Sequence, residues 1–179
     1  MPQFVVFLRG INVGDHTVIK EKLQEIFASL GFENVSTYKQ SGNVIFDANS
    51  ADPEAINAKV EAKLRDVLGY AVAAFVYTVP QLKKIIESEL FKGQDKEGAS
   101  FLVTFLASAP NKSSLQLPLT IPKSTAQIIS SNGTAVFSVT HGGGEGGMPN
   151  PFLESKLKVK ATTRNMNIIR EIVKKIEKE

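Results

Sequence analysis

The sequence predicts an α+β protein made of two parts. Short continuous apolar runs have the length of buried strands, and other segments repeat apolar residues at helical spacing. Clusters of Gly, Pro, Asn and Asp separate these segments. The chain has 179 residues, of which 42% are hydrophobic, and this suffices for one large or two small domains with a buried core.

The first half alternates strands and helices in a recognisable order. Thr17 is predicted to cap the first helix and Gly31 to stop it, whereas Asp52-Pro53 starts the second helix and Gly69 ends it. In chain order we expect a strand at 4–8 covered on both faces, a helix at 18–30, strands at 35–39 and 44–46, the helix of 53–68, and a strand at 71–77. This β-α-β-β-α-β order is the split βαβ, or ferredoxin-like, arrangement.

The second half predicts a smaller α+β unit packed on the first. Its strongest local signal is Ser131-Asn132-Gly133 between two strand-like runs, which is typical of a hairpin. In chain order we expect a helix opened by Thr78, a connection over 92–100, a strand over 101–106, a short helix over 109–117, an extended stretch over 118–122, strands over 126–130 and 134–140, a short helix over 152–157, and a final helix from about Asn165. We therefore divide the chain into 1–92 and 93–179.

Two polar, glycine-containing segments follow apolar runs, at 9–14 and at 38–43. In the predicted sheet, the first and third strands are central antiparallel neighbours, so the end of the first lies beside the start of the third. The two segments should therefore meet at one rim of the sheet.

The residues of this rim suit a polar or anionic ligand. Arg9 can donate two parallel hydrogen bonds to a carboxylate or phosphate, and Gly10 and Gly14 allow the loop to present backbone N–H groups. The amide and hydroxyl side chains that could read a ligand are Asn12, Tyr38, Gln40, Ser41 and Asn43. The same residues also suit turns, buried loop backbone and an ion pair at the strand end, so a purely structural role stays open.

A third polar cluster, Thr162-Thr163-Arg164-Asn165, precedes the final helix. Thr162 or Thr163 is predicted to cap that helix. Arg164 would then lie at the positive end of the helix dipole, where an arginine is disfavoured. We therefore expect an anionic partner beside it, either Asp, Glu or a ligand, and count Thr163, Arg164 and Asn165 among the candidate ligand-binding residues.

Composition excludes several classes of protein. The chain has no cysteine and no run of eighteen apolar residues, which argues against disulfides, thiolate metal sites and a membrane span. Its net charge of +3 is only weak evidence for a polyanion partner, and nucleic acid is not excluded. His16 and His141 lack metal-ligand spacing, and the glycine-rich segment 142–147 lacks the Lys-Ser/Thr ending of a P-loop. We expect a cytoplasmic protein with no cofactor, in which that segment is a linker or, alternatively, a lid.

Three blocks resemble the signature blocks of the domain-of-unknown-function family 1697: 8–14 (LRGINVG), 37–46 (TYKQSGNVIF) and 161–165 (ATTRN). The resemblance implies a bacterial-type cytoplasmic α+β protein with a ferredoxin-like first half, and it implies no reaction. The chain departs from the family pattern at Met166, where members usually carry Trp, and over 141–148, where members tend to show a basic residue and a hydroxyl.

Three classes of function remain. The first is a binding module for a small anionic or nucleotide-like ligand at the rim formed by the first βα loop, the second hairpin turn and the start of the last helix. The second is an enzyme of transferase or hydrolase type that uses the same rim, although no nucleophile–base pair or metal set is recognisable. The third is an RNA-binding ferredoxin-like protein, against which the doubly apolar strand at 4–8 argues.

Overall fold

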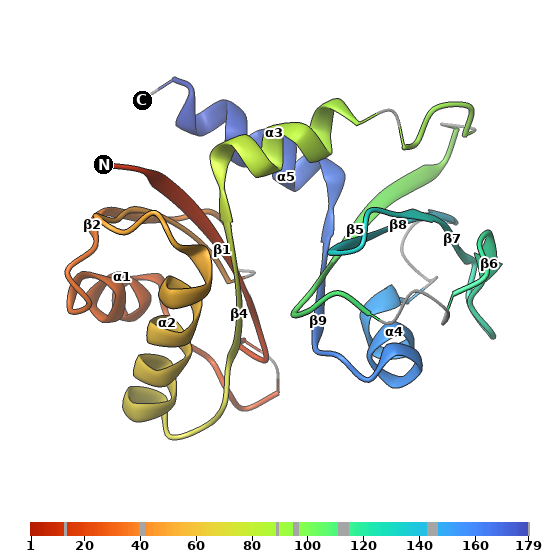
Figure 1. Cartoon of the computed structure of the whole chain (residues 1–179). Coiled ribbons are helices and arrows are strands. Elements are labelled where there is room, and N and C mark those ends of the chain that lie inside the picture. The colour runs from red at the N-terminus through yellow and green to blue at the C-terminus, as the bar shows by residue number, and fades with distance from the viewer. Residues whose placement is uncertain are drawn as a thin grey trace. The chain divides into compact units, whose positions relative to one another are not determined.

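The computed structural model describes residues 1–12, 14–39, 42–88, 90–94, 97–110, 115–142 and 147–178. The chain falls into two compact units, Met1–Lys83 and Lys84–Glu179, each of which holds a β-sheet and helices (Figure 1). The predicted α+β class is confirmed.

Unit 1 contains a four-stranded antiparallel sheet in the order β2-β3-β1-β4. Its elements are β1 (Gln3–Arg9), α1 (Lys20–Ala28), β2 (Glu33–Thr37), β3 (Asn43–Asp47), α2 (Pro53–Leu68) and β4 (Ala73–Thr78). The element order and the strand order are together those of the split βαβ arrangement that the sequence predicts.

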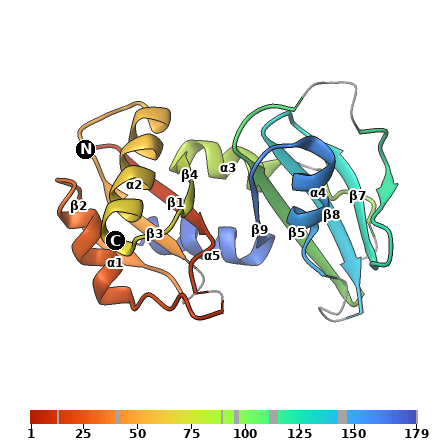
Figure 2. The same cartoon turned by 90° about the horizontal axis from the view of Figure 1, so that it is seen from below.

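Both α1 and α2 cover the same face of this sheet (Figures 1 and 2). Phe4, Val6 and Leu8 of β1 belong to the core beneath the helices. Because side chains alternate along a strand, Val5 and Phe7 point to the opposite face, and they are also fully buried. Burial on both faces explains why the sequence of β1 is a continuous apolar run.

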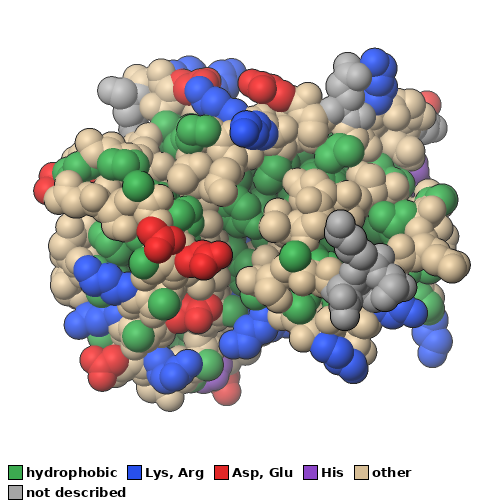
Figure 3. All heavy atoms as spheres, in the orientation of Figure 1, with side chains coloured by type: hydrophobic (Ala, Val, Ile, Leu, Met, Phe, Trp, Pro, Cys, Tyr) green, Lys and Arg blue, Asp and Glu red, His purple; other side chains and the backbone are tan. Residues whose placement is uncertain are grey.

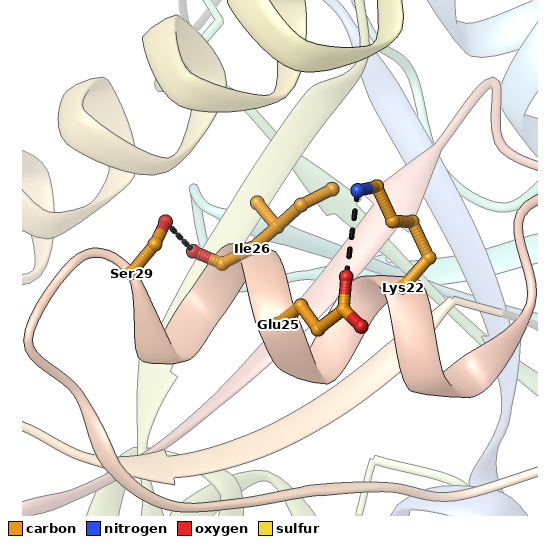
Figure 4. Close-up of polar contacts among 4 residues, drawn as sticks. All are labelled: Lys22, Glu25, Ile26 and Ser29. Carbon is orange, nitrogen blue, oxygen red and sulfur yellow. Dashed lines mark hydrogen bonds and ion pairs between the residues drawn. The ribbon is translucent and has the colours of Figure 1, made fainter.

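The start of α1 differs from the prediction. Thr17 is not its cap, because the helix begins at Lys20 and Ile19 occupies the N-cap position with extended backbone. The carboxamide of Asn12 accepts a hydrogen bond from the Val18 N–H at 2.7 Å, so a side chain from the preceding loop binds the chain just before the helix. At the other end, the Ser29 hydroxyl donates to the Ile26 carbonyl at 2.7 Å, and Lys22 lies 3.4 Å from Glu25 (Figure 4).

The bounds of α2 follow the sequence signals closely. The Asp52 carboxylate accepts a hydrogen bond from the Glu54 N–H at 3.0 Å, and Pro53 occupies the first turn. Gly69 ends the helix in the left-handed conformation, with φ of 80°. The predicted cap, proline start and glycine stop of this helix are therefore confirmed.

Unit 2 contains a five-stranded antiparallel sheet in the order β6-β7-β8-β5-β9. Helix α3 (Val79–Glu87) crosses the boundary between the units, which therefore lies earlier in the chain than the predicted 92/93. The other elements are β5 (Ala99–Leu106), β6 (Leu119–Thr120), β7 (Ala126–Ser131), β8 (Ala135–His141), α4 (Pro149–Leu157), β9 (Ala161–Asn165) and α5 (Met166–Ile176).

The predicted hairpin between β7 and β8 is confirmed. The Asn132 carboxamide accepts hydrogen bonds from the N–H groups of Thr134 and Ala135, at 3.1 and 2.8 Å. Gly133 adopts a φ of 94°, a conformation that glycine reaches without strain. The Asn-Gly pair thus closes the turn by a side-chain bond and by permissive backbone.

One prediction for unit 2 is wrong, and another falls largely outside the described residues. Thr162 and Thr163 do not cap the last helix, because both belong to β9, where Thr163 pairs with Thr104 of β5. β-Branched residues suit a pleated strand, and this preference outweighs their capacity to cap. The short helix expected over 109–117 falls largely on 111–114, outside the described residues, and the described residues on either side of 111–114 are not helical. Within the described part of the chain, no helix combines the length and apolarity needed to span a bilayer.

Tyr77 of β4 provides a test of the packing in unit 1. Burial raises the pKa of its phenol well above the usual value. The Tyr77 phenol ionises near pH 10 in the unfolded chain but resists ionisation in the folded protein. Its contribution to the free energy of unfolding is therefore complete below about pH 10 and is lost as the pH rises further. Denaturant unfolding of Tyr77→Phe should therefore show a weaker loss of stability between neutral pH and about pH 11 than the parent protein shows. Identical pH slopes would contradict the burial of this phenol.

Candidate functional site

The two polar segments of the first half meet at one edge of the first sheet. Phe7 of β1 pairs with Asn43 of β3, and the Leu8 N–H donates to the Gly42 carbonyl at 2.8 Å. The antiparallel pairing of β1 with β3 therefore places the loop after β1 beside the turn before β3. This proximity is the one that the predicted topology required.

The loop after β1 is held in shape by backbone conformation and by one side chain. Gly10, Asn12 and Gly14 have positive φ values of 82°, 55° and 59°. Asn is among the few non-glycine residues that tolerate this region, since its short amide bonds locally. Here the Asn12 carboxamide binds the Val18 N–H, so the loop is closed immediately before α1.

Asn43 closes the hairpin between β2 and β3 from within. Its side-chain N–H donates to the Tyr38 carbonyl at 3.0 Å, and the Tyr38 N–H donates to the Asn43 carbonyl at 3.0 Å. The Asn43 side chain is only 1% exposed. The Lys39 ammonium lies 5.4 Å from the centre of the Tyr38 ring, within the range of a cation–π contact.

A pocket of about 590 Å³ lies where these segments face the start of α1. Its volume is within the range of small-molecule sites in proteins. It is lined by residues of three segments, all in unit 1: Asn12 of the loop; Thr17, Val18, Ile19, Lys20, Glu21 and Leu23 around the helix start; and Thr37, Lys39, Gly42 and Asn43 of the hairpin.

The first turn of α1 contributes an electropositive wall to this pocket. Ile19 is the N-cap residue and forms no side-chain hydrogen bond with the first-turn N–H groups. Lys20 and Lys39 add two cations, and Glu21 adds one carboxylate, which lies 3.6 Å from the Lys20 ammonium. Both members of that pair are well exposed, so the attraction between them is weak. The wall therefore favours a negatively charged group.

The predicted site residues are only partly those of the pocket. Asn12 and Asn43 line it, whereas Arg9, Gly10, Gly14 and Tyr38 belong to the same two segments without lining it. Gln40 and Ser41 lie outside the described residues. The lining residues that sequence reasoning missed are Thr17, Val18, Ile19, Lys20, Glu21, Leu23, Thr37, Lys39 and Gly42. No sequence signal pointed to Ile19, because Thr17 was expected to cap the helix and only the structure places the N-cap at residue 19.

The third polar cluster belongs to unit 2. The Arg164 guanidinium is 9% exposed, and its Nη1 donates to the Thr162 hydroxyl at 2.8 Å and to the Thr163 carbonyl at 2.9 Å. Burial lowers the pKa of Arg164 to about 10, so it remains charged at neutral pH. Asn165 caps α5, since its side chain accepts a hydrogen bond from the Asn167 N–H at 2.9 Å.

Buried hydroxyl groups gather on one face of the second sheet. Thr104 and Thr163 share a hydrogen bond of 2.8 Å, and Thr140 shares one of 2.7 Å with Thr125. Ser138 is fully buried, and its hydroxyl has no hydrogen-bond partner. The first of these pairs accounts for Thr163, one of the candidate ligand-binding residues.

The described residues show no constellation of a familiar metal centre. Among them, no group of three His, Asp or Glu side chains could hold a metal ion. His16 stacks on Tyr70 with ring centres 4.0 Å apart. Residues 143–146 of the glycine-rich segment lie outside the description, so the choice between linker and lid stays a prediction.

These features define an α+β protein with a pocket at one edge of a split βαβ sheet. The model of the family described as protein of unknown function DUF1697 matches residues 1–137, so the chain belongs to that family. The predicted membership is thus confirmed. The first two blocks lie inside the match, and the block at 161–165 lies beyond it.

Among solved structures, the chain is similar to the conserved bacterial protein SP0830 from Streptococcus pneumoniae. The sequence identity is 17%, the TM-score is 0.64, and the match covers 99% of each chain. This likeness shows the fold. No curated protein matches the sequence.

Gly42 allows a direct test of the contact between the two segments. An added Cβ would lie 2.7 Å from Cγ2 of Ile11 and 3.1 Å from Cβ of Leu8, and φ is +72°. Gly42→Ala should lower the free energy of unfolding by about 2–4 kcal/mol, through both backbone strain and overpacking. Gly31 is the matched control, because its φ is +81° and nothing lies within 4 Å of the added Cβ. Gly31→Ala should cost about 1–2 kcal/mol. Equal losses in denaturant unfolding would argue against the close approach at Gly42.

The hydroxyl groups of unit 2 allow a second test. Thr104→Val leaves the buried Thr163 hydroxyl without its partner and should cost about 1–3 kcal/mol of stability. Ser138→Ala removes a buried hydroxyl that has no hydrogen-bond partner, so it relieves a desolvation penalty and should raise stability by about 1–3 kcal/mol. A large loss for Ser138→Ala in the same unfolding experiment would show that water or a ligand binds this hydroxyl.

Proposed function

We propose that this protein is a binding module for a small anionic or nucleotide-like ligand. The ligand lies in the pocket of unit 1, between the first βα loop, the turn before β3 and the start of α1. The observation that carries this proposal is the pocket itself, whose lining includes Lys20 in the first turn of α1 and Lys39 of the hairpin. An anion there would interact with the helix dipole, with backbone N–H groups and with two ammonium groups at once.

The predicted contribution of the last helix is not needed for this proposal. Arg164 belongs to β9 and donates within its own strand, and Asn165 is engaged as a helix cap. The proposal therefore uses residues of unit 1 alone. We further propose a cytoplasmic location, which the cysteine-free composition of the chain favours.

An enzyme that uses the same pocket is the second candidate. Among its described lining residues, Glu21 and the lysines are the titratable groups, and no histidine or nucleophile–base pair lines the pocket. Ion pairing with Lys20 and the short distance to the helix N-terminus suit Glu21 to a structural role. Ligand binding therefore ranks before catalysis.

RNA binding is the third candidate and has the least support. Ferredoxin-like RNA binders stack bases on aromatic side chains exposed on the central strands. Phe7 of β1 and Phe75 of β4, on the face away from the helices, are at most 3% exposed. The face of the molecule drawn in Figure 3 carries Asp and Glu side chains together with Lys and Arg, rather than a continuous basic patch.

A titration with inorganic phosphate tests the proposal. Backbone amide signals of the first turn of α1 should shift in an NMR titration, and the affinity should fall as ionic strength rises. Lys39→Gln and Lys20→Gln should each weaken binding about three- to tenfold, because each removes one partly screened attraction.

Lys22→Gln is the matched control for these variants. Lys22 lies on the same helix and carries the same charge, but it pairs with Glu25 (Figure 4). It does not line the pocket. This variant should bind phosphate within about twofold of the parent. An equal loss in all three variants would mean that net charge, rather than the pocket, attracts the anion.

A further inference from the structure

Ile19 breaks two local rules at once. It occupies the N-cap position of α1, with φ of −71° and ψ of 155°, where Ser, Thr, Asp or Asn would bind the first-turn N–H groups. It also exposes 62% of its surface, although it is a large aliphatic residue. An exposed aliphatic residue in place of a stabilising cap is expected where function, rather than stability, determines the residue type at that position.

The position of Ile19 in the pocket indicates what that function is. It lines the pocket beside Val18 and Leu23, both of which are at least nine-tenths buried. These three side chains form an apolar wall next to the polar groups of Asn12 and Lys39. The pocket therefore offers an apolar surface together with an anion-binding end, and its volume of about 590 Å³ is of the size that holds drug-sized ligands.

We infer that the ligand is a phosphate monoester that carries a ring, with the ring lying on Ile19 and the phosphate at the first turn of α1. This inference rests on the proposed function and adds the apolar half of the ligand to it. A flat ring against an aliphatic side chain removes apolar surface of both partners from water. The phosphate is left within reach of Lys20, Lys39 and the first-turn N–H groups.

Substitution of Ile19 by Ala separates the two halves of the site. Ala removes most of the aliphatic side chain and adds no hydrogen-bond acceptor that would compete with the phosphate for the first-turn N–H groups. Phenyl phosphate and adenosine 5′-monophosphate should bind the parent protein about tenfold tighter than inorganic phosphate binds it. In Ile19→Ala this advantage should fall to about twofold, whereas the affinity for inorganic phosphate changes little.

Val67→Ala is the matched control. Val67 is an exposed aliphatic residue of α2 in the same unit, 38% exposed, and it does not line the pocket. This variant should keep the full preference for phenyl phosphate. Isothermal titration of all three phosphates against the parent and both variants, together with thermal unfolding of each protein, gives the required comparison.

The outcomes separate this inference from the proposed function. If the three phosphates bind the parent equally well, the inference is wrong and the anion site stands. If Ile19→Ala keeps the tenfold preference, or loses affinity for inorganic phosphate as strongly as for phenyl phosphate, the ring does not lie on Ile19. If none of the phosphates binds the parent protein, the proposed function fails and the inference fails with it.

Discussion

The antiparallel pairing of β1 with β3 is the constraint on which the site depends. It sets Phe7 opposite Asn43, and its last bond runs from the Leu8 N–H to the Gly42 carbonyl. Two segments about thirty residues apart in the chain are thereby brought to one sheet edge. The approach is close enough that Gly42 leaves no space for a Cβ beside Ile11. A larger residue at position 42 would separate the strands at the place where the pocket begins.

Two asparagines convert this proximity into a defined pocket. Asn12 binds the backbone just before α1, and Asn43 binds the backbone of Tyr38 across the hairpin. Each uses its amide to satisfy main-chain groups that the adjacent regular structure leaves without a partner. These bonds hold two of the segments that line the pocket, and Ile19 lies at the start of α1 as an exposed apolar residue. The proposed binding site rests on this combination of hydrogen-bonded amides, a helix start without a side-chain cap and exposed aliphatic surface.

Much of the fold of unit 1 was predictable because its signals are local. The buried run of β1, the Asp52-Pro53 start and the Gly69 stop each act through their own neighbours. The same holds for the Asn-Gly turn between β7 and β8. Predictions were wrong where contacts outside the local pattern decided the outcome. Thr162 and Thr163 have the chemistry of helix caps, but pairing with β5 places them in a strand. Thr17 does not cap α1, because the helix begins at Lys20 and the Asn12 amide binds the Val18 N–H ahead of it.

The site divides in the same way. By itself, the sequence determined the β-α-β-β-α-β order, the family and the meeting of two polar segments at one edge, because hydrophobic periodicity and turn residues are encoded locally. Only the tertiary structure decided which side chains face the pocket, since that depends on where α1 begins and on how the hairpin closes against it. The sequence pattern marks Lys39 and Ile19 only as ordinary turn and helix residues, so it did not predict them as residues of the pocket. Arg164, which its sequence context placed at a helix start, became part of a buried strand because β9 pairs with β5.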